Sequence, residues 1–302
     1  MRQLEWLKQR LQEMVPDLEL REQEPMSAHT SFKIGGPAAL MALPQSEAEA
    51  AAAVRAAAEA GVQPLFIGNG SNLLVSDAGI DGFVIKAAGG LAQYKREGNR
   101  ITAGSGILLA RLAQIAQKNG LTGLEFAHGI PGSLGGAITM NAGAYGGELA
   151  QVVRSVTCLN SRGEIEVLTD CGFAYRHSCF ETGERMILSA CLELSPGDPA
   201  EIQAQMARLM EQRRSKQPLE WPSGGSAFKR PEGHFAAALI DQCGLKGRTV
   251  GGAQVSEKHA GFLINRGGAT CADVVALMEQ VQDEVLRQTG ITLEPELKRI
   301  GR

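Results

Sequence analysis

Apolar residues recur at helical spacing in the first fourteen residues, and charged residues fill the positions between them. The apolar positions are Leu4, Leu7, Leu11 and Met14. This spacing predicts a surface helix that buries one stripe and exposes its charged side. A signal peptide needs an uncharged apolar stretch instead, so we expect the protein to stay in the cytoplasm.

Two capping boxes predict where two of the helices begin. Ser46 with Glu49, and Thr270 with Asp273, pair a hydroxyl with an acidic side chain three residues later, which satisfies the first free backbone N–H groups of a helix. Both runs end at a glycine, the residue that most easily closes a helix. Apolar periodicity adds two more. The predicted helices cover residues 46–61, 107–120, 200–216 and 270–290.

Short apolar runs bounded by glycine or polar residues predict strands. They cover residues 62–68, 82–87, 100–106, 152–160, 163–169, 184–194, 260–265 and 291–300. The sequence SPGDPA at 195–200 changes the composition before a long helix, and we place a domain boundary there.

Composition excludes several classes of function. The chain of 302 residues has a net charge of -3 and no basic cluster with interleaved aromatic residues, so we expect neither nucleic acid nor a membrane as partner. Six cysteines contain no C-x-x-C pair, which argues against zinc and predicts buried thiols without disulfides. Glycine is enriched, at 37 residues, and concentrates in a few loops where a ligand would bind. No metal site and no oligomeric state is indicated.

The first of these loops is GNGSN, residues 68–72, which follows a predicted strand. Successive backbone N–H groups in such a turn form a concavity for phosphate oxygens, and Ser71 and Asn72 add side-chain donors. The third glycine of a dinucleotide fingerprint is missing, so a tight turn remains the alternative.

The second loop is IPGSLGGAITMNAGAYGGE, residues 130–148. Many glycines among apolar residues indicate a backbone that lies against a large flat ligand, or else a buried turn. Two separate loops of this kind favour a flavin dinucleotide, FAD, as the cofactor.

Three further segments carry candidate chemistry. Arg176 in YRHSCF has the planar fork that pairs with a carboxylate, although a surface arginine is the commoner case. Ser226 in SGGS, residues 223–226, is either presented to a ligand or part of a polar turn. Alternation in LEPELKRI places Leu293 opposite Glu296, whose strand face is either solvated or reaches into a cleft.

Seven motifs taken together resemble one enzyme family, UDP-N-acetylenolpyruvoylglucosamine reductase, over nearly the whole chain from residue 27. They are TSFKIGGPA, IGNGSNLLVSD, IPGSLGGAITMNAGAYGGE, YRHSCF, GGSAFKRP, GGAQVSEKHAGFLIN and LEPELKRIG. The resemblance implies an α+β protein: a vanillyl-alcohol-oxidase (PCMH) type FAD-binding domain of two subdomains, about 1–86 and 87–200, and an α+β substrate-binding domain, 201–302. The short passage after Phe180 is similar to the type II enzymes, which lack an extra tyrosine loop.

In this family NADPH reduces non-covalent FAD, and hydride then passes to the enolpyruvyl group of UDP-N-acetylglucosamine enolpyruvate, giving UDP-N-acetylmuramate for peptidoglycan. The resemblance places the catalytic residues at Arg176, Ser226 and Glu296. Arg176 would stabilise the enolate, and Ser226 would protonate it as a general acid. A bare carboxylate would repel the enolate, so Glu296 is either paired with Arg176 or protonated.

The resemblance also places the binding residues. The cofactor contacts fall on Gly68, Asn69, Gly70, Ser71, Asn72, Ile130, Pro131, Gly132, Ser133, Gly135, Gly136, Asn141, Ala142 and Gly143. The substrate contacts fall on Tyr175, Lys216, Lys229 and Arg230, and Arg230 stands where some relatives have asparagine. The alternatives are another FAD oxidoreductase of the vanillyl-alcohol-oxidase type and a nucleotide-sugar-binding module without catalysis.

Overall fold

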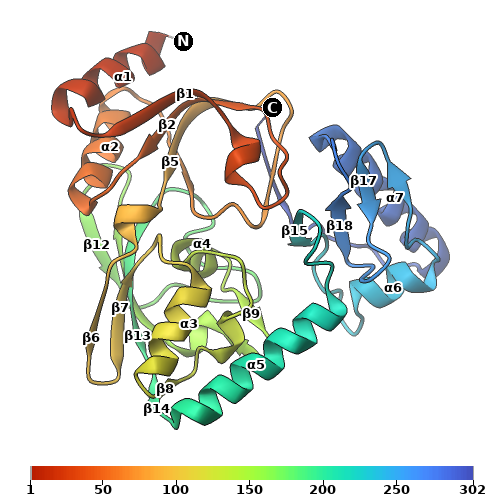
Figure 1. Cartoon of the computed structure of the whole chain (residues 1–302). Coiled ribbons are helices and arrows are strands. Elements are labelled where there is room, and N and C mark those ends of the chain that lie inside the picture. The colour runs from red at the N-terminus through yellow and green to blue at the C-terminus, as the bar shows by residue number, and fades with distance from the viewer. Residues whose placement is uncertain (1, 302) are drawn as a thin grey trace. The chain divides into compact units, whose positions relative to one another are not determined.

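The computed structural model describes residues 2–301, which form two compact units that alternate along the chain (Figure 1). Unit 1 comprises the residues up to Glu22, Leu40–Asn69 and Gly82–Gln212. Unit 2 comprises Gln23–Ala39, Gly70–Asp81 and the residues from Arg213 onward. Two short N-terminal segments therefore belong with the C-terminal third. The assignment of FAD to 1–200 and of substrate to 201–302 stays a prediction.

Most of unit 1 is built on two sheets. The first has the order β1-β2-β5-β3 and the second the order β12-β11-β13-β7-β6. The strands of the first are β1 (Glu19–Pro25), β2 (Pro37–Leu43), β3 (Leu65–Ile67) and β5 (Ile80–Lys86). Those of the second are β6 (Tyr94–Glu97), β7 (Arg100–Gly104), β11 (Val153–Leu159), β12 (Ile165–Leu168) and β13 (Met186–Glu193). All pairings within the second sheet are antiparallel.

The helices of unit 1 cover these sheets with apolar faces. They are α1 (Arg2–Met14), α2 (Glu47–Glu59), α3 (Leu109–Lys118), α4 (Leu134–Thr139) and most of α5 (Pro199–Lys216). Leu7 and Leu11 of α1 are fully buried in one core with Val54 of α2 and Phe83 of β5. Residues of α3, α4 and α5 pack into a second core with the five-stranded sheet. The amphipathic N-terminal helix is thus confirmed.

Unit 2 contains a four-stranded antiparallel sheet of order β15-β18-β17-β16 and a parallel pair, β4 with β19. The strands are β4 (Leu73–Val75), β15 (Ser223–Ser226), β16 (Thr249–Val250), β17 (Ala253–Val255), β18 (Phe262–Asn265) and β19 (Lys298–Ile300). Two helices, α6 (Ala236–Gln242) and α7 (Cys271–Thr289), share one apolar core with this sheet.

The two predicted capping boxes and the predicted C-terminal strand agree with the structure to different degrees. Thr270 and Asp273 form the full capping box of α7, which closes at Gly290 in the left-handed conformation. At α2 only half of the box exists: Ser46 accepts from the Glu49 N–H, but the Glu49 carboxylate accepts from the Gln45 N–H instead of from Ser46. The strand predicted over 291–300 is wrong except at Lys298–Ile300.

Small elements lie inside the glycine-rich segment, where no regular structure was predicted. Helix α4 is followed by a tight hairpin of β9 (Gly143–Ala144) and β10 (Gly147–Glu148).

A second short pair of strands lies elsewhere in the chain and joins β8 (Leu121–Thr122) to β14 (Ser195–Pro196). The 3-10 helices are Met26–His29, Gly89–Leu91, Glu125–Ala127 and Leu149–Gln151.

The structure bears on three expectations from sequence: the state of the cysteines, metal binding and membrane-spanning helices. All six cysteines are free, and three of them, Cys158, Cys171 and Cys271, are buried, whereas the other three are partly exposed. Within residues 2–301, no group of three His, Cys, Asp or Glu side chains is placed to hold a metal ion. None of the helices in the described part of the chain combines the length and apolarity that crossing a membrane needs.

Candidate functional site

In unit 1 the beginning of GNGSN lies directly against the second glycine-rich loop. The Asn69 side-chain amide donates to the carbonyl of Pro131. A Cβ on Gly68 would collide with the Ser133 hydroxyl, so only glycine fits there without movement. The structure therefore brings together two sets of predicted cofactor residues that are more than sixty positions apart in sequence.

Backbone bonds fix the segment 130–135 to the turn that precedes α3. Leu109 donates to the carbonyl of Gly132 at 3.0 Å, and Leu134 donates to the carbonyl of Ile107 at 2.9 Å. These bonds flank a strand-like bridge between Leu108 and Ser133. The glycine-rich loop is thus an ordered part of the second core rather than a free loop.

Two features of this loop fit a ligand. The hydroxyls of Ser105 and Ser133 are buried and have no hydrogen-bond partner within residues 2–301, which is an uncommon and costly state for a polar atom. Gly136 is exposed, and a Cβ on it would find its nearest neighbour, Ser133 Oγ, at 3.8 Å. Backbone with no side chain and open space beside it suits a flat ring such as that of a flavin.

Arg176 lies in a two-residue hairpin turn of unit 1. Ala174 and His177 exchange both backbone hydrogen bonds, each at 3.1 Å, so that Tyr175 and Arg176 form the turn. Arg176 has φ of 53°, a left-handed conformation that costs a non-glycine residue free energy. Such strain persists where the surroundings impose it, and it is concentrated at functional sites.

The Arg176 side chain is half-buried and points along the second glycine-rich loop. Its Nη2 donates to the carbonyl of Gly143 at 3.4 Å, and its guanidinium lies 5.1 Å from the centre of the Tyr175 ring. The Tyr175 ring itself is 54% exposed. A predicted catalytic residue, a predicted substrate residue and a predicted cofactor residue are therefore neighbours in this unit.

In unit 2 the end of GNGSN is held by chain segments far away in sequence. Gly70 has φ of 63°, and a Cβ there would collide with the His29 carbonyl, so glycine is required twice over. The Asn72 side-chain amide donates to the carbonyl of Glu296 at 3.1 Å, and Lys298 donates to the carbonyl of Asn72 at 2.9 Å. The Ser71 hydroxyl is half-buried and makes no hydrogen bond to the residues described.

Ser226 ends β15 next to the segment that carries Glu296. Strand β15 pairs with β18 through a register shift between Ser223 and Ser226, where Gly225 has φ of 84°. Glu296 donates its backbone N–H to the carbonyl of Ala227 at 2.8 Å. Ser226 directly precedes Ala227, so the predicted catalytic residues Ser226 and Glu296 lie one pairing position apart on neighbouring segments. SGGS is thus part of a strand with a bulge and not the polar turn considered from sequence.

The hydroxyl of Ser226 is half-buried and has no hydrogen-bond partner among residues 2–301. None of the histidines in the described part of the chain forms a hydrogen bond to it, as a catalytic base would. This is the state expected of a proton donor presented to a ligand rather than of an activated nucleophile.

The predicted substrate cations of unit 2 differ in their surroundings. Lys229 is 3.5 Å from the Glu294 carboxylate, and Arg230 stacks at 4.4 Å over the exposed ring of Phe235. Lys216 is exposed at the end of α5 and forms no ion pair with the described residues. Burial lowers the pKa of His259 below its ordinary value, and the positive charges of Lys246 and Lys216 lower it further.

Cysteine chemistry is disfavoured at the two most perturbed thiols. Burial raises the pKa of both Cys158 and Cys171 to about 11. A thiolate is the reactive form, so these side chains remain protonated and inert at neutral pH.

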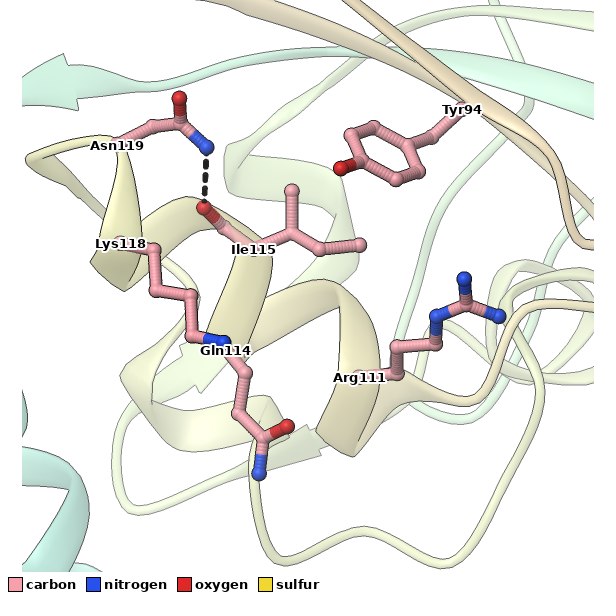
Figure 2. A pocket seen from close by; sticks show the side chains of 6 residues that line it. All are labelled: Tyr94, Arg111, Gln114, Ile115, Lys118 and Asn119. Carbon is pink, nitrogen blue, oxygen red and sulfur yellow. Dashed lines mark hydrogen bonds between the residues drawn. The ribbon is translucent and has the colours of Figure 1, made fainter.

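One pocket of unit 1 contains none of the predicted residues. Its volume is about 310 Å³, and Figure 2 shows that the exposed face of α3 and Tyr94 of β6 line it. Arg111 and Lys118 supply positive charge, and Asn119 donates from its side chain to the Ile115 carbonyl at 2.8 Å. This pocket lacks the glycine-rich backbone and the unpaired buried hydroxyls described above.

Sequence reasoning assigned Asn141 to the cofactor and gave Ser178 no role, whereas both side chains bond to the backbone around the site. Asn141 and Ser178 have side chains fully or almost fully buried against the backbone of neighbouring loops. Asn141 has φ of 41°, and the preference of asparagine for left-handed turns is a local sequence signal for this conformation, in addition to the motif that names the residue. Ser178 carries no such signal.

Comparison with known proteins agrees with this arrangement. Residues 217–300 match the family model "UDP-N-acetylenolpyruvoylglucosamine reductase, C-terminal domain", and residues 38–169 match "FAD binding domain". The enzymes named UDP-N-acetylenolpyruvoylglucosamine reductase from Agathobacter rectalis and Pediococcus pentosaceus are 47% and 46% identical. The alignments cover 96% of this chain and 96% of the former, and 97% of this chain and 98% of the latter.

A solved structure gives the same result for the fold. The crystal structure of UDP-N-acetylenolpyruvylglucosamine reductase from Thermus caldophilus matches with a TM-score of 0.82 and 35% identity, covering 94% of this chain and 99% of that one. The vanillyl-alcohol-oxidase-type FAD-binding fold predicted from sequence is confirmed. The chain belongs to the UDP-N-acetylenolpyruvoylglucosamine reductase family, a family of oxidoreductases with an FAD-binding domain.

Proposed function

We propose that this protein reduces the enolpyruvyl group of UDP-N-acetylglucosamine enolpyruvate with NADPH, through non-covalent FAD, and so forms UDP-N-acetylmuramate for peptidoglycan. Family membership supports the reaction class, and the motifs that carry the resemblance support the substrate. The expected cytoplasmic location stays a prediction.

The residues of unit 1 fit the cofactor. The exposed Gly136 and the segment from Ile130 to Gly132 would lie against the flavin, and the Ser133 hydroxyl is a donor without a partner among the residues that the structure describes. FAD supplies, when bound, a hydride acceptor and donor that no side chain can provide. The backbone N–H groups of the glycine-rich turn GNGSN suit the diphosphate.

Arg176 would bind the carboxylate of the substrate. When hydride adds to the terminal carbon of the enolpyruvyl group, negative charge moves onto that carboxylate as an enolate. A guanidinium held in a rigid turn stabilises this charge more in the transition state than in the ground state, which is the condition for catalysis.

Ser226 would give a proton to the ether-bearing carbon of the enolate, and Glu296 would assist next to it. The single observation that carries this assignment is the unpartnered Ser226 hydroxyl, one pairing position from Glu296 and without a histidine. Lys216, the unpaired cation at the end of α5, would bind the UDP diphosphate as a mobile point charge.

The test separates the two half-reactions in purified protein and in Ser226→Ala. Wild-type protein should carry FAD that denaturation releases, and NADPH should reduce this FAD. Ser226→Ala should leave that reduction unchanged, whereas reoxidation by the enolpyruvyl substrate should slow by about 10²- to 10⁴-fold, as for the loss of a positioned general acid. Ser226→Cys, which retains a transferable proton, should be less impaired. Reoxidation of the alanine variant at the wild-type rate would remove Ser226 from the mechanism.

A further inference from the structure

Asn141 connects the second glycine-rich loop to the turn that carries Arg176. Its side-chain Nδ2 donates to the carbonyl of Ala174 at 3.1 Å, and its Oδ1 accepts from the N–H of Ala150 at 3.0 Å. The residue is 1% exposed. Both polar atoms of the side chain therefore have partners inside unit 1, and almost no surface remains for a ligand.

Two more bonds run from the same loop to the same turn. The buried Ser178 hydroxyl donates to the carbonyl of Thr139 at 2.9 Å, and Arg176 itself donates to the carbonyl of Gly143 at 3.4 Å. Three successive odd-numbered positions of the loop, 139, 141 and 143, thus bind the segment 174–178. The strained conformation of Arg176 needs such support, because left-handed backbone is unfavourable for a residue with a Cβ.

Asn72 does the same in unit 2. Its side-chain amide donates to the carbonyl of Glu296, and its own carbonyl accepts from the N–H of Lys298. Asn72, the last residue of GNGSN, is therefore bonded both to Glu296 and to the residue two positions after it, Lys298. Each unit has one asparagine, from one glycine-rich loop, whose amide is bonded to the segment of a predicted catalytic side chain.

We infer that Asn72 and Asn141 are positioning residues, which fix Glu296 and Arg176 relative to the cofactor loops, and that their side-chain amides do not serve FAD. This inference rests on the proposed function for the roles of Glu296 and Arg176. A catalytic group displaced by about 1 Å loses about 10²-fold in rate, so asparagine-to-carbonyl bonds of this kind have a measurable effect.

The variants are Asn141→Asp and Asn72→Asp, which keep the size and remove the amide donor. The matched control is Asn119→Asp, at a position that is not among the predicted site residues and has no hydrogen bond to any of them within residues 2–301. Asn119 also donates to a backbone carbonyl, that of Ile115 (Figure 2), and accepts from Arg96 at 3.2 Å, a bond that aspartate retains. Asn141→Gly, which suits φ of 41°, is the second variant at that position in case a buried aspartate prevents folding.

Three quantities are measured in each holoenzyme: the Kd of FAD, the rate of FAD reduction by NADPH, and the rate of reoxidation by the enolpyruvyl substrate. We expect the first two to change less than about threefold and reoxidation to slow at least about tenfold, with the control unchanged. In an Arg176→Lys background, Asn141→Asp should have little further effect, since it acts through Arg176. A weaker FAD complex that reoxidises at the wild-type rate once saturated would overturn the inference.

Amide hydrogen exchange separates this inference from the proposed function. Loss of the Asn141 donor should increase exchange at Ala174 and His177, whose N–H groups close the turn, whether or not the substrate is right. If wild-type protein does not reduce the enolpyruvyl substrate, the proposed function fails while this result still stands. Unchanged exchange in both Asn141 variants would overturn the positioning role directly.

Discussion

Gly136→Ala separates what the fold needs from what the cofactor needs. Gly136 lies inside α4, where glycine is less favourable than alanine by about 1 kcal/mol. The nearest atom to a new Cβ would be 3.8 Å away, an ordinary van der Waals contact, so no steric cost opposes this gain. The apoprotein should therefore become more stable by about 0.5–1 kcal/mol.

The cofactor should respond in the opposite direction. If the flavin lies against the exposed backbone at Gly136, the added methyl group overfills that contact at a cost of about 1–3 kcal/mol, which raises the Kd of FAD about 5- to 150-fold. Thermal unfolding of apoprotein measures the first effect, and flavin fluorescence titration measures the second. A stabilised variant that binds FAD with the wild-type Kd would refute the placement of the cofactor at α4.

Gly70→Ala is the counterpart of that experiment. Its Cβ would collide with the backbone carbonyl of His29, and φ of 63° adds strain, so the fold itself should lose more than about 2 kcal/mol. Weaker FAD binding in Gly70→Ala would therefore not show that Gly70 contacts the cofactor. The comparison shows why glycine at a predicted cofactor position is not by itself evidence of a ligand.

Three further outcomes follow from individual side chains. Arg176→Lys should slow flavin reoxidation by substrate at least about tenfold, because lysine lacks the bidentate fork, and should leave reduction by NADPH nearly unchanged; equal losses in stopped-flow absorbance would contradict its role. The folded state holds the pKa of His259 below its value of 6.5, since burial disfavours the charged form, so stability is full above about pH 6.5 and is lost as pH falls from there towards the folded pKa. His259→Gln should flatten that loss in urea unfolding between pH 7.5 and 5.5. Thr270→Ala should lower the free energy of unfolding by about 1 kcal/mol through loss of the capping box of α7, and an unchanged urea midpoint would contradict this.

The sequence predicted those parts of the fold whose causes are local. The capping box at Thr270 and the apolar stripe of α1 act within one or two helical turns, and both were correct. Strand β1 was missed because none of its seven residues is buried, and β6 because all four of its residues are exposed. An edge strand that buries no residue leaves no alternation of apolar and polar positions in the sequence from which it could be predicted.

The C-terminal segment shows how a correct side-chain pattern accompanied a wrong backbone prediction. Leu293 and Leu297 are buried as the alternation required, at 1% and 6% exposure. Within residues 2–301, the backbone between them nevertheless forms only two isolated backbone–backbone bonds, to Ala227 and Lys229, on either side of a bridge at Pro295, besides the bond from the Asn72 side chain. Proline has no N–H to donate, which interrupts the ladder at this point.

The sequence predicted the residues of the candidate site but not the hydrogen bonds that hold them in place. Family motifs name Arg176 and Glu296, yet no motif links Asn72 to a residue 224 positions later or Asn141 to one 33 positions later. Those links depend on where the fold brings two loops together. A side-chain amide that bonds to a backbone carbonyl does not depend on the identity of the residue it meets, and so leaves no trace in the partner's sequence.

The two glycines of SGGS are needed for different physical reasons, which explains the motif without a nucleophile. A Cβ on Gly224 would collide with the Leu297 side chain, so this position is glycine to let the C-terminal segment pack. Gly225 has open space around its Cα but φ of 84°, so it is glycine for its backbone conformation, at the register shift of β15. Close packing of Gly224 before the register shift and the left-handed Gly225 within it leave Ser226 at the strand end, with a hydroxyl that has no hydrogen-bond partner in residues 2–301. The two glycines therefore account for the position of the Ser226 hydroxyl at the strand end, and neither glycine has to touch a ligand for this purpose.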